Sequence, residues 1–392
     1  MSDVYVLGVD MLKFGRFPNV TVPQLGAQAA LLALDDAGVT IQQIEALYCA
    51  NLGQANGMVG QRILREIGQT GVPVVNCANA CAAGATAFRE AWLSIKAGVC
   101  DLVLAVGVEQ MGRGLLTGAA ANGISTEGLL GSGTMPAVFA EAGMEHTRKY
   151  GTSFEQFAKV SVKNHQHSTL NPKAMYQYET PLEQVMSAEM IAYPNTKLMC
   201  SVNVDGAAAA VLVSERKARE LGMKRAVRIK ASVLTSDPWQ ERDLVMADIN
   251  TCTRTAASQA YAMAGIGPDE LDLVELHDCF ATAELLHYEN LGLCVDGQSG
   301  QLIDSGETKL GGRIPVNVSG GLLSKGHPLG ATGIANIYEV STHLRGEAGA
   351  RQVDGARFGM THVLGLGSAC AIHILERVSE SPARAHLTYW DH

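Results

Sequence analysis

The sequence predicts an α/β protein in which helices cover a largely buried sheet. Short apolar segments rich in β-forming residues alternate with Ala-rich segments of helical pattern along the 392 residues. The chain also matches itself once, through two pairs of similar segments in the same order. These observations predict two related halves, residues 1–222 and 223–392, with a loop domain inserted into the first half at about 116–195.

Composition limits the classes of function. With 47% hydrophobic and 18% charged residues, the chain can form two globular cores. The net charge of −9 argues against a nucleic-acid binder, which needs a basic surface. The nine cysteines are scattered and form no C-x-x-C pair, so we expect free thiols in a reducing compartment. There is neither a signal-peptide pattern nor an apolar run of about 20 residues, so we expect a cytoplasmic protein without an integral membrane segment.

The individual elements follow from local patterns. In the first half, helices are expected at 25–37 and 82–97, each closed by a glycine. Strands are expected at 72–75 and 101–107, because both segments are apolar and bounded by turn residues. Within the insertion, a polar helix is expected around 155–166.

The internal repeat is the second basis for the predicted fold. Residues 37–47 align with 264–274, and both read as a helix end, a short turn and a strand. Residues 81–86 align with 327–332 at a slightly larger offset. Each match alone is explained equally well by chance similarity between segments rich in Ala and Gly. Two matches in the same order favour an ancient duplication.

Cys81 is the candidate nucleophile. It follows a predicted strand and precedes a predicted helix, where free amide groups and the helix dipole favour a thiolate. A buried structural cysteine is the commoner alternative for any one cysteine. If the halves are related by a pseudo-twofold axis, Cys81 and His327 hold equivalent loop-to-helix junctions and face one central site.

His327 is the candidate base. It stands just before a proline that suits the first turn of a helix, and five glycines surround it in seventeen residues. A histidine in this place can deprotonate a nearby thiol. A glycine-rich phosphate loop with His327 as a bystander is the alternative, although neither Walker nor Rossmann spacing is present.

His277, Asp278 and Cys279 form a third cluster, which follows a strand of the second half. Such a cluster suggests a metal site, but adjacent residues rarely ligate one ion without more distant partners. No such partner is evident in the sequence, so no metal is predicted. We assign His277 and Cys279 to polar and proton-transfer roles, with a solvated strand end as the alternative.

Taken together, these segments resemble the thiolase family. N-A-C-A-x-G at Cys81 matches its nucleophile motif, and G-H-P-x-G-A-T-G at His327 matches its histidine motif. Residues 107–111 resemble the G-x-E-x-M segment, and 205–208 resemble the D-G-A-A strand. H-D-C-F at 277–280 is similar to the subgroup related to sterol-carrier-protein-2 thiolases, where better-known thiolases have N-E-A-F.

The resemblance implies a thiolase fold of two pseudo-twofold-related βαβαβαββ halves in five layers, α/β/α/β/α. It also implies an acyltransferase that cleaves 3-ketoacyl-CoA to acetyl-CoA and a shortened acyl-CoA, or that runs the reverse Claisen condensation, through an acyl-Cys81 intermediate. Coenzyme A is then a substrate, and no cofactor is expected. The backbone N–H groups of Cys81 and Gly365 are implied to hold the tetrahedral intermediates.

One departure from the better-known thiolases reassigns a role. Their second catalytic cysteine lies in a C-x-G motif, but Val363 stands at that position here and Cys370 is seven residues further on. In the subgroup, the H-D-C-F cysteine is thought to take over acid/base catalysis, which assigns this duty to Cys279. His277 and His327 are implied to hold the enolate oxygen.

Two other functions stay open. Some thiolase-like chains act as aldolases in sterol side-chain breakdown, or as acyltransferases, together with an OB-fold partner protein. A non-catalytic acyl-CoA or lipid-binding protein is the other alternative. The intact Cys81, Cys279 and His327 favour thiolysis in lipid metabolism, such as fatty acid β-oxidation.

We expect acyl-CoA and CoA as ligands and a homodimer or dimer of dimers. The candidate phosphate contacts are Lys159, Lys163, Lys173 and Lys197, for which a solvated surface is the commoner role.

Overall fold

The computed structural model of the chain describes residues 2–112, 135–222, 225–238, 249–366 and 368–378. Within these residues, nine strands join into one hydrogen-bonded sheet. Their order across the sheet is β3 (Val74–Cys77), β2 (Ala46–Ala50), β4 (Leu102–Glu109), β7 (Gly206–Ser214), β1 (Val4–Met11), β8 (Val227–Thr235), β11 (Ala369–Arg377), β10 (Phe358–Gly365) and β9 (Leu273–Glu275).

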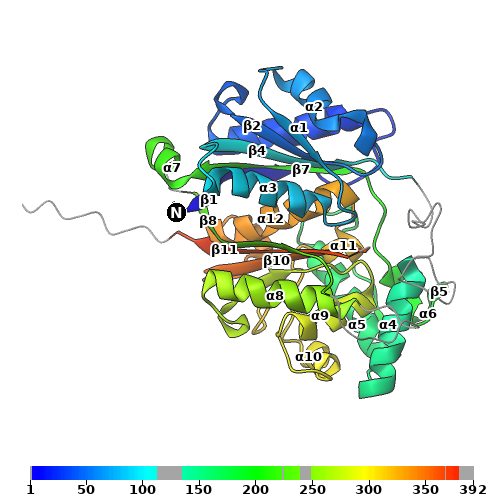
Figure 1. Cartoon of the computed structure of the whole chain (residues 1–392). Helices are drawn as coiled ribbons and strands as arrows, with labels where there is room; N and C mark the ends of the chain where they lie inside the picture. The colour runs from blue at the N-terminus through cyan, green and yellow to red at the C-terminus, as the bar shows by residue number, and fades with distance from the viewer. Residues whose placement is uncertain (1, 113–134, 223–224, 239–248, 367, 379–392) are drawn as a thin grey trace, which may run out of the picture.

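The sheet divides into two parts where β1 meets β8. These strands pair at only two positions, Tyr5 with Arg228 and Val6 with Val227. Figure 1 shows the parts as two separate layers, one above the other, with helices between them. Read outward from the junction, the strand order is β1-β7-β4-β2-β3 in one part and β8-β11-β10-β9 in the other. Each half therefore builds its own part of the sheet in the same order.

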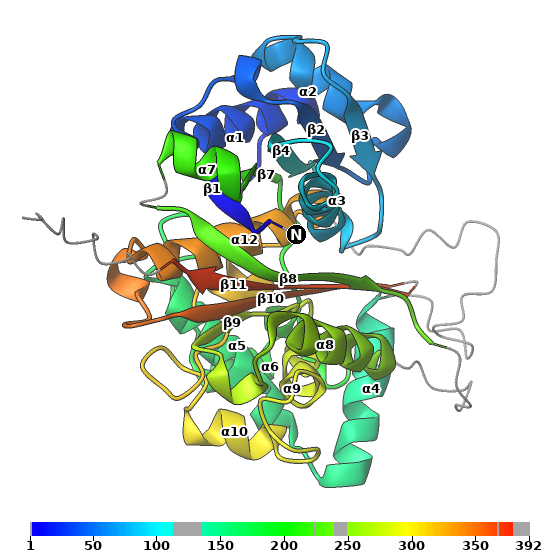
Figure 2. The same ribbon diagram turned by 60° about the vertical axis from the view of Figure 1, so that its left-hand side comes forward.

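Helices complete a stack of five layers (Figures 1 and 2). The first and second helices pack on the outer face of the first part, and two long helices fill the space between the parts. Another pair covers the outer face of the second part. This arrangement confirms the predicted α/β/α/β/α order. The pair on the outer face of the first part is α1 (Val22–Ala37) and α2 (Val59–Ile67). The pair between the parts is α3 (Ala83–Lys96) and α12 (Leu329–Arg345), and the pair on the second part is α8 (Asn250–Ala264) and α9 (Ala281–Asn290).

The segment between β4 and β7 adds smaller elements that pack against the second half, beside α9 (Figure 2). Its residues 113–134, which include the first part of the predicted insertion, lie outside the described residues. The remaining elements are α4 (Met135–Tyr150), α5 (Phe154–Ser168), α6 (Leu182–Ser187), β5 (Met190–Ala192), β6 (Asn195–Thr196), α7 (Glu215–Leu221), α10 (Ser299–Ser305) and α11 (Gly321–Ser324).

The first aligned pair of segments has the same structure in both halves. Gly38 ends α1 and Gly265 ends α8, with φ of 66° and 70° in the left-handed region that glycine adopts at low cost. A short 3₁₀ turn follows in each half, Ile41–Gln43 and Pro268–Glu270, and leads into β2 or β9. The third strand of the second half is reduced to an isolated bridge from Val316 to β9. The halves therefore share one βαβαβαββ plan with one shortened strand.

The second pair of aligned segments, 81–86 and 327–332, comes together at the centre of the molecule. A Cβ atom on Gly84 would lie 2.6 Å from the carbonyl oxygen of Gly330, its counterpart in the repeat. A Cβ on Gly333 would lie 2.2 Å from the backbone nitrogen of Ala85. Only glycine allows the first turns of α3 and α12 to approach so closely. The N-terminal ends of the two helices therefore meet at the middle of the five layers.

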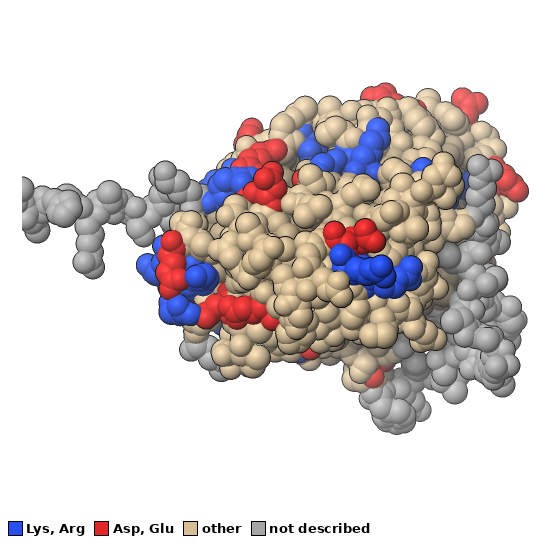
Figure 3. All heavy atoms as spheres, turned by 90° about the horizontal axis from the view of Figure 1, so that it is seen from above, with Lys and Arg blue, Asp and Glu red and all other residues tan. Residues whose placement is uncertain are grey.

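Every residue of the central strands β4 and β7 is buried, whereas the edge strand β3 is partly exposed. On the face above α1 and α2, acidic and basic side chains lie next to one another (Figure 3). Among the described residues, no helix has the length and apolar character that crossing a bilayer requires.

Candidate active site

A sharp turn after β3 presents Cys81 to the centre of the molecule. Ala80 has a φ of 46°, which is unusual for a residue with a side chain and marks a locally constrained backbone. Asn79 fixes the turn, since its Nδ2 donates to Thr86 Oγ1 in the first turns of α3 at 3.1 Å. The Cys81 thiol, which is half-buried, lines a cavity of about 730 Å³.

His327 is oriented by the helix that follows it. Thr332 Oγ1 donates to the carbonyl oxygen of Pro328 at 3.0 Å, so its lone pair accepts the Nδ1–H of His327 at 2.7 Å. This arrangement leaves Nε2 as the basic nitrogen. Nε2 is buried and has no hydrogen-bond partner. The ring is therefore set to accept a proton from the cavity side.

His277 and Cys279 enter the cavity from the segment after β9. Side chains alternate along this extended segment, so His277 and Cys279 face the cavity while Asp278 faces away. Asp278 instead accepts hydrogen bonds from the Leu322 backbone and from Asn164 Nδ2, at 2.7 and 2.8 Å. The cluster predicted from the sequence therefore divides into two cavity residues and one structural residue.

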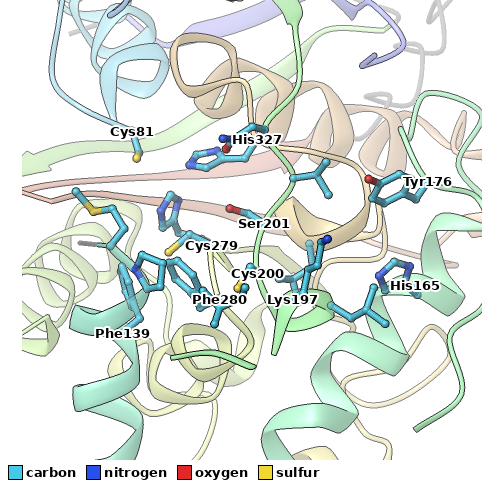
Figure 4. Close-up of a pocket in the computed structure, with 18 of the residues that line it drawn as sticks. Cys81, Phe139, His165, Tyr176, Lys197, Cys200, Ser201, Cys279, Phe280 and His327 are labelled. Carbon is cyan, nitrogen blue, oxygen red and sulfur yellow. The ribbon is translucent and has the colours of Figure 1, made fainter. Parts of the chain in front are cut away.

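Three predicted residues come together at one point. Cys81, His277 and His327 each have one nitrogen or sulfur atom, of the kind that can ligate a metal, that lies within 4.8 Å of the corresponding atoms of the other two residues. The two imidazole rings meet edge to face, with centroids 5.1 Å apart and planes at 77°. Figure 4 shows the Cys279 sulfur below Cys81 and His327, in the same cavity. The sequence offered no partner for a metal at His277, whereas the structure supplies Cys81 and His327.

Gly365 lies at the end of β10, against the turn that carries Cys81. A Cβ atom there would lie 2.8 Å from the Asn79 carbonyl oxygen and 3.3 Å from the Ala82 nitrogen, so a side chain would displace the turn. Val363 and Cys370 are buried in the neighbouring strands and do not line the cavity.

Burial keeps the reactive pair neutral in the free protein. It raises the pKa of Cys81 to about 12, and the nearby Glu109 carboxylate adds to this rise. Burial lowers the pKa of His327 to about 3, and the Lys325 charge acts in the same direction. The pKa of Cys279 is raised and that of His277 is lowered, again mainly by burial. The helix N-terminus favours a thiolate at Cys81, but the loss of solvent acts against it.

The cavity has two chemically different ends (Figure 4). The apolar end lies beside the reactive cysteines, and its Phe139 and Phe280 rings stack with centroids 5.2 Å apart. At the other end, Tyr176, His165 and Lys197 gather. Arg16 also lines the cavity. The remaining apolar lining residues are Met135, Pro136, Ile191, Leu198, Val202, Leu323, Leu364 and Leu366.

Of the four candidate phosphate-binding lysines, only Lys197 lines the cavity. Lys159 pairs with Asp304 and Glu155 on the surface. Lys163 is buried against Glu284, and Lys173 pairs with Asp10. Lys197 also has a carboxylate nearby, that of Glu189 at 3.8 Å, which lines the same cavity. Arg16 was missed because an isolated arginine near the N-terminus carries no motif.

A buried ionic network supports the loop that carries His327. Ser319 donates to Glu275 at 2.6 Å, and Lys325 Nζ lies 3.8 Å from Glu275 and 3.9 Å from Glu339. Arg351 completes the network through Glu339 at 2.8 Å. Its positive charge and that of Lys325 hold the pKa of Glu339 down to about 2, against the effect of burial. These residues fix the loop without touching the cavity.

Comparison with known proteins agrees with this geometry. The family model described as Thiolase, N-terminal domain matches residues 4–192, and the model Thiolase C-terminal domain-like matches 236–377. The chain is 39% identical to sterol carrier protein 2 of Bos taurus, over 98% of this chain and 74% of the relative. The chain belongs to the thiolase family. The sterol-carrier-protein-2 subgroup predicted from H-D-C-F is thereby confirmed.

Other thiolase relatives carry informative names. An acetyl-CoA acetyltransferase of Methanothermobacter thermautotrophicus is 40% identical, over 96% of this chain and 100% of the relative. Benzoylsuccinyl-CoA thiolase subunit BbsB of Thauera aromatica is 36% identical, over 93% and 95%. Two solved structures share the fold: an Ltp2-ChsH2(DUF35) aldolase (TM-score 0.83, 22% identity, 96% of this chain and 98% of that one) and human mitochondrial 3-ketoacyl-CoA thiolase in complex with CoA (0.72, 19%, 96% and 98%).

Proposed function

We propose that this thiolase-family chain is an acyltransferase that cleaves 3-ketoacyl-CoA with CoA, or forms the same bond by Claisen condensation. The observation that carries the proposal is the convergence of Cys81, His277 and His327 within 4.8 Å, in a cavity that Cys279 also lines. A nucleophile, an oriented base and a second thiol are the groups that this chemistry needs.

The first step forms an acyl-enzyme. His327 Nε2 takes the proton of the Cys81 thiol, and the sulfur attacks the 3-keto carbon of the substrate. The backbone N–H groups of Cys81 and Gly365 hold the resulting oxyanion, and each donor of this kind contributes about 100- to 1,000-fold in rate. When the oxyanion collapses, the bond between C2 and C3 breaks and its electron pair passes into the enolate of acetyl-CoA.

The second thiol completes the cleavage. His277 and the newly protonated His327 hold the enolate oxygen, and the Cys279 S–H protonates its α-carbon, which leaves a Cys279 thiolate. The incoming CoA thiol returns a proton to Cys279, and its sulfur attacks the acyl group on Cys81. Cys81 leaves and recovers its proton from His327. Every group then has its starting protonation state.

The two chemically different ends of the cavity support one orientation of the bound substrate. The apolar end, with Phe139 and Phe280 beside the reactive sulfurs, suits the acyl chain. The cationic side chains of Arg16 and Lys197 suit the phosphates of coenzyme A, which enters as a substrate. A homodimer, a cytoplasmic location and a place in fatty acid β-oxidation remain predictions.

A second candidate is a thiolase-like aldolase or acyltransferase subunit that works with an OB-fold partner. It is supported by the names of two similar proteins, a benzoylsuccinyl-CoA thiolase subunit and an aldolase that pairs Ltp2 with ChsH2(DUF35). The retained Cys81, Cys279 and His327 favour thiolysis by this chain alone.

An assay of the isolated chain separates the two candidates. Loss of the enolate absorbance of acetoacetyl-CoA and of a longer 3-ketoacyl-CoA is followed with and without free CoA. CoA-dependent loss of absorbance by the chain alone supports the thiolase, and the better substrate sets the chain-length class. Absence of turnover on both substrates contradicts it and favours the subunit that needs a partner.

A further inference from the structure

The active site holds a set of ligand atoms that proton transfer alone does not require. Cys81, His277 and His327 come from three separate segments, yet their donor atoms lie within 4.8 Å of one another. Both histidines are almost fully buried, and His277 Nδ1 and His327 Nε2 have no hydrogen-bond partner. One thiol and two imidazoles around one point are the ligands of a transition-metal site.

We propose that this group is an inhibitory binding site for a borderline-soft divalent cation, with Zn²⁺ preferred. Sulfur and imidazole nitrogen suit zinc, whereas magnesium and calcium require oxygen ligands. In a tetrahedral site with zinc–ligand distances of about 2.0–2.3 Å, ligand atoms lie about 3.3–3.8 Å apart. Binding therefore requires rotation of the three side chains to bring their ligand atoms from within 4.8 Å to this separation. The cavity leaves the fourth position open to water.

The surroundings of the three ligands fit this role. The hydrogen bond from His327 Nδ1 to Thr332 fixes the tautomer and aims Nε2 at the site, as the outer partners of metal-bound histidines do. The backbone N–H of His277 donates to His362 Nδ1 at 3.3 Å, which anchors that segment from behind. Cys81 is half-buried and lines the cavity, so an ion has a path to the site.

Zinc binding and acyl transfer exclude each other, because both use the Cys81 sulfur and the His327 Nε2 lone pair. Binding replaces the thiol proton, which is released to solvent, so one proton leaves for each ion bound. The inhibitory effect rests on the proposed thiolase activity, whereas ion binding itself does not.

Cobalt gives a readout that is independent of turnover. Protein treated with EDTA, without added thiols that compete for metal, is titrated with Co²⁺ and followed by absorption. The expected result is one Co²⁺ per chain with a sulfur-to-cobalt charge-transfer band and intense tetrahedral d–d bands, both displaced by Zn²⁺. Cys81→Ala removes the charge-transfer band, and His277→Ala weakens Zn²⁺ binding at least about tenfold. Cys100→Ser, a thiol outside the cavity, leaves both unchanged.

The following outcomes decide the inference. Only weak octahedral Co²⁺ spectra, or a charge-transfer band that persists in Cys81→Ala, overturn it. In active enzyme, stoichiometric Zn²⁺ is expected to stop thiolysis and EDTA to restore it, while Mg²⁺ has no effect; full activity in the presence of bound Zn²⁺ also overturns it. A protein that binds Co²⁺ through Cys81 but turns over no substrate supports the metal site and contradicts the proposed function.

Discussion

Thr86 and Thr332 occupy equivalent positions in the two halves, and each donates a hydrogen bond to the carbonyl oxygen four residues earlier, at 2.9 and 3.0 Å. Each also accepts a hydrogen bond from the segment before its helix. Thr86 accepts from Asn79 Nδ2 at 3.1 Å, and Thr332 accepts from His327 Nδ1 at 2.7 Å. The same anchor fixes the nucleophile turn in one half and the base in the other.

The hydrogen bond from His327 Nδ1 to Thr332 Oγ1 predicts the effect of replacing Thr332. In Thr332→Val, His327 loses the acceptor that sets its tautomer, so Nε2 is no longer reserved as the base. We expect kcat for thiolysis to fall at least about tenfold while the thermal unfolding temperature changes little. Thr332→Ser, which keeps the hydroxyl group, should restore most of kcat. An unchanged kcat in the valine variant would contradict the orienting role.

The raised pKa of Cys81 predicts how the free enzyme reacts with iodoacetamide. Because burial raises this pKa to about 12, the thiolate fraction is small at pH 7 and grows with pH. The alkylation rate of Cys81, measured by peptide mass spectrometry, should rise about tenfold per pH unit between pH 7 and 10. A rate that is already constant between pH 5 and 8 would instead indicate a preformed thiolate–imidazolium pair.

The sequence predicts the reactive residues better than it predicts their electrostatics. Cys81 and His327 stand in local motifs, and their equivalence follows from the repeat, so both were assignable without coordinates. Their protonation states depend on how deeply distant segments bury them, and no local pattern records that depth. The helix N-terminus that favours a Cys81 thiolate is visible in the sequence, whereas the burial that opposes it is not.

The rest of the site depends on long-range contacts. Arg16 reaches the cavity from a loop far away in sequence, and Arg351 supports the His327 loop through Glu339. Neither side chain belongs to a motif. The alternation of helices and strands was predictable from local patterns, and the five-layer order followed from the resemblance to thiolases. The shortening of the third strand of the second half to a single bridge at Val316 was not predictable, because it leaves no pattern of its own.

The proposed division of labour between the two thiols predicts a separation of partial reactions. Cys279→Ala should still be acetylated at Cys81 by acetyl-CoA, with a smaller loss of rate than α-proton exchange suffers, because a CoA thiolate can leave without the proton that Cys279 donates, whereas the α-carbon needs a base. Exchange of the acetyl-CoA α-proton with deuterium should fall at least about 100-fold, because the acid/base at that carbon is gone. Cys200→Ala is the matched control, since Cys200 lines the same cavity and bonds to the Thr196 carbonyl oxygen. Equal losses in both variants would argue against a specific role for Cys279.

The position of Lys197 predicts an effect on coenzyme A binding. Lys197→Ala should raise KM for CoA several-fold with little change in kcat, because a solvated contact to phosphate adds ground-state affinity only. The increase should shrink at high salt, since ions screen exposed charges. Lys159→Ala removes an equal charge that pairs with Asp304 and does not line the cavity. The same KM for both variants would exclude Lys197 from the phosphate site.

The central claim is that an acyl group travels through the Cys81 sulfur, and intact-protein mass spectrometry tests it most directly. The protein is mixed with acetoacetyl-CoA without free CoA, and peptide mapping then locates any adduct. We predict one acetyl group per chain, on Cys81, that free CoA discharges and that Cys81→Ala cannot form, whereas Cys100→Ser forms it normally. Turnover without this adduct, or an adduct that survives in Cys81→Ala, would contradict the account.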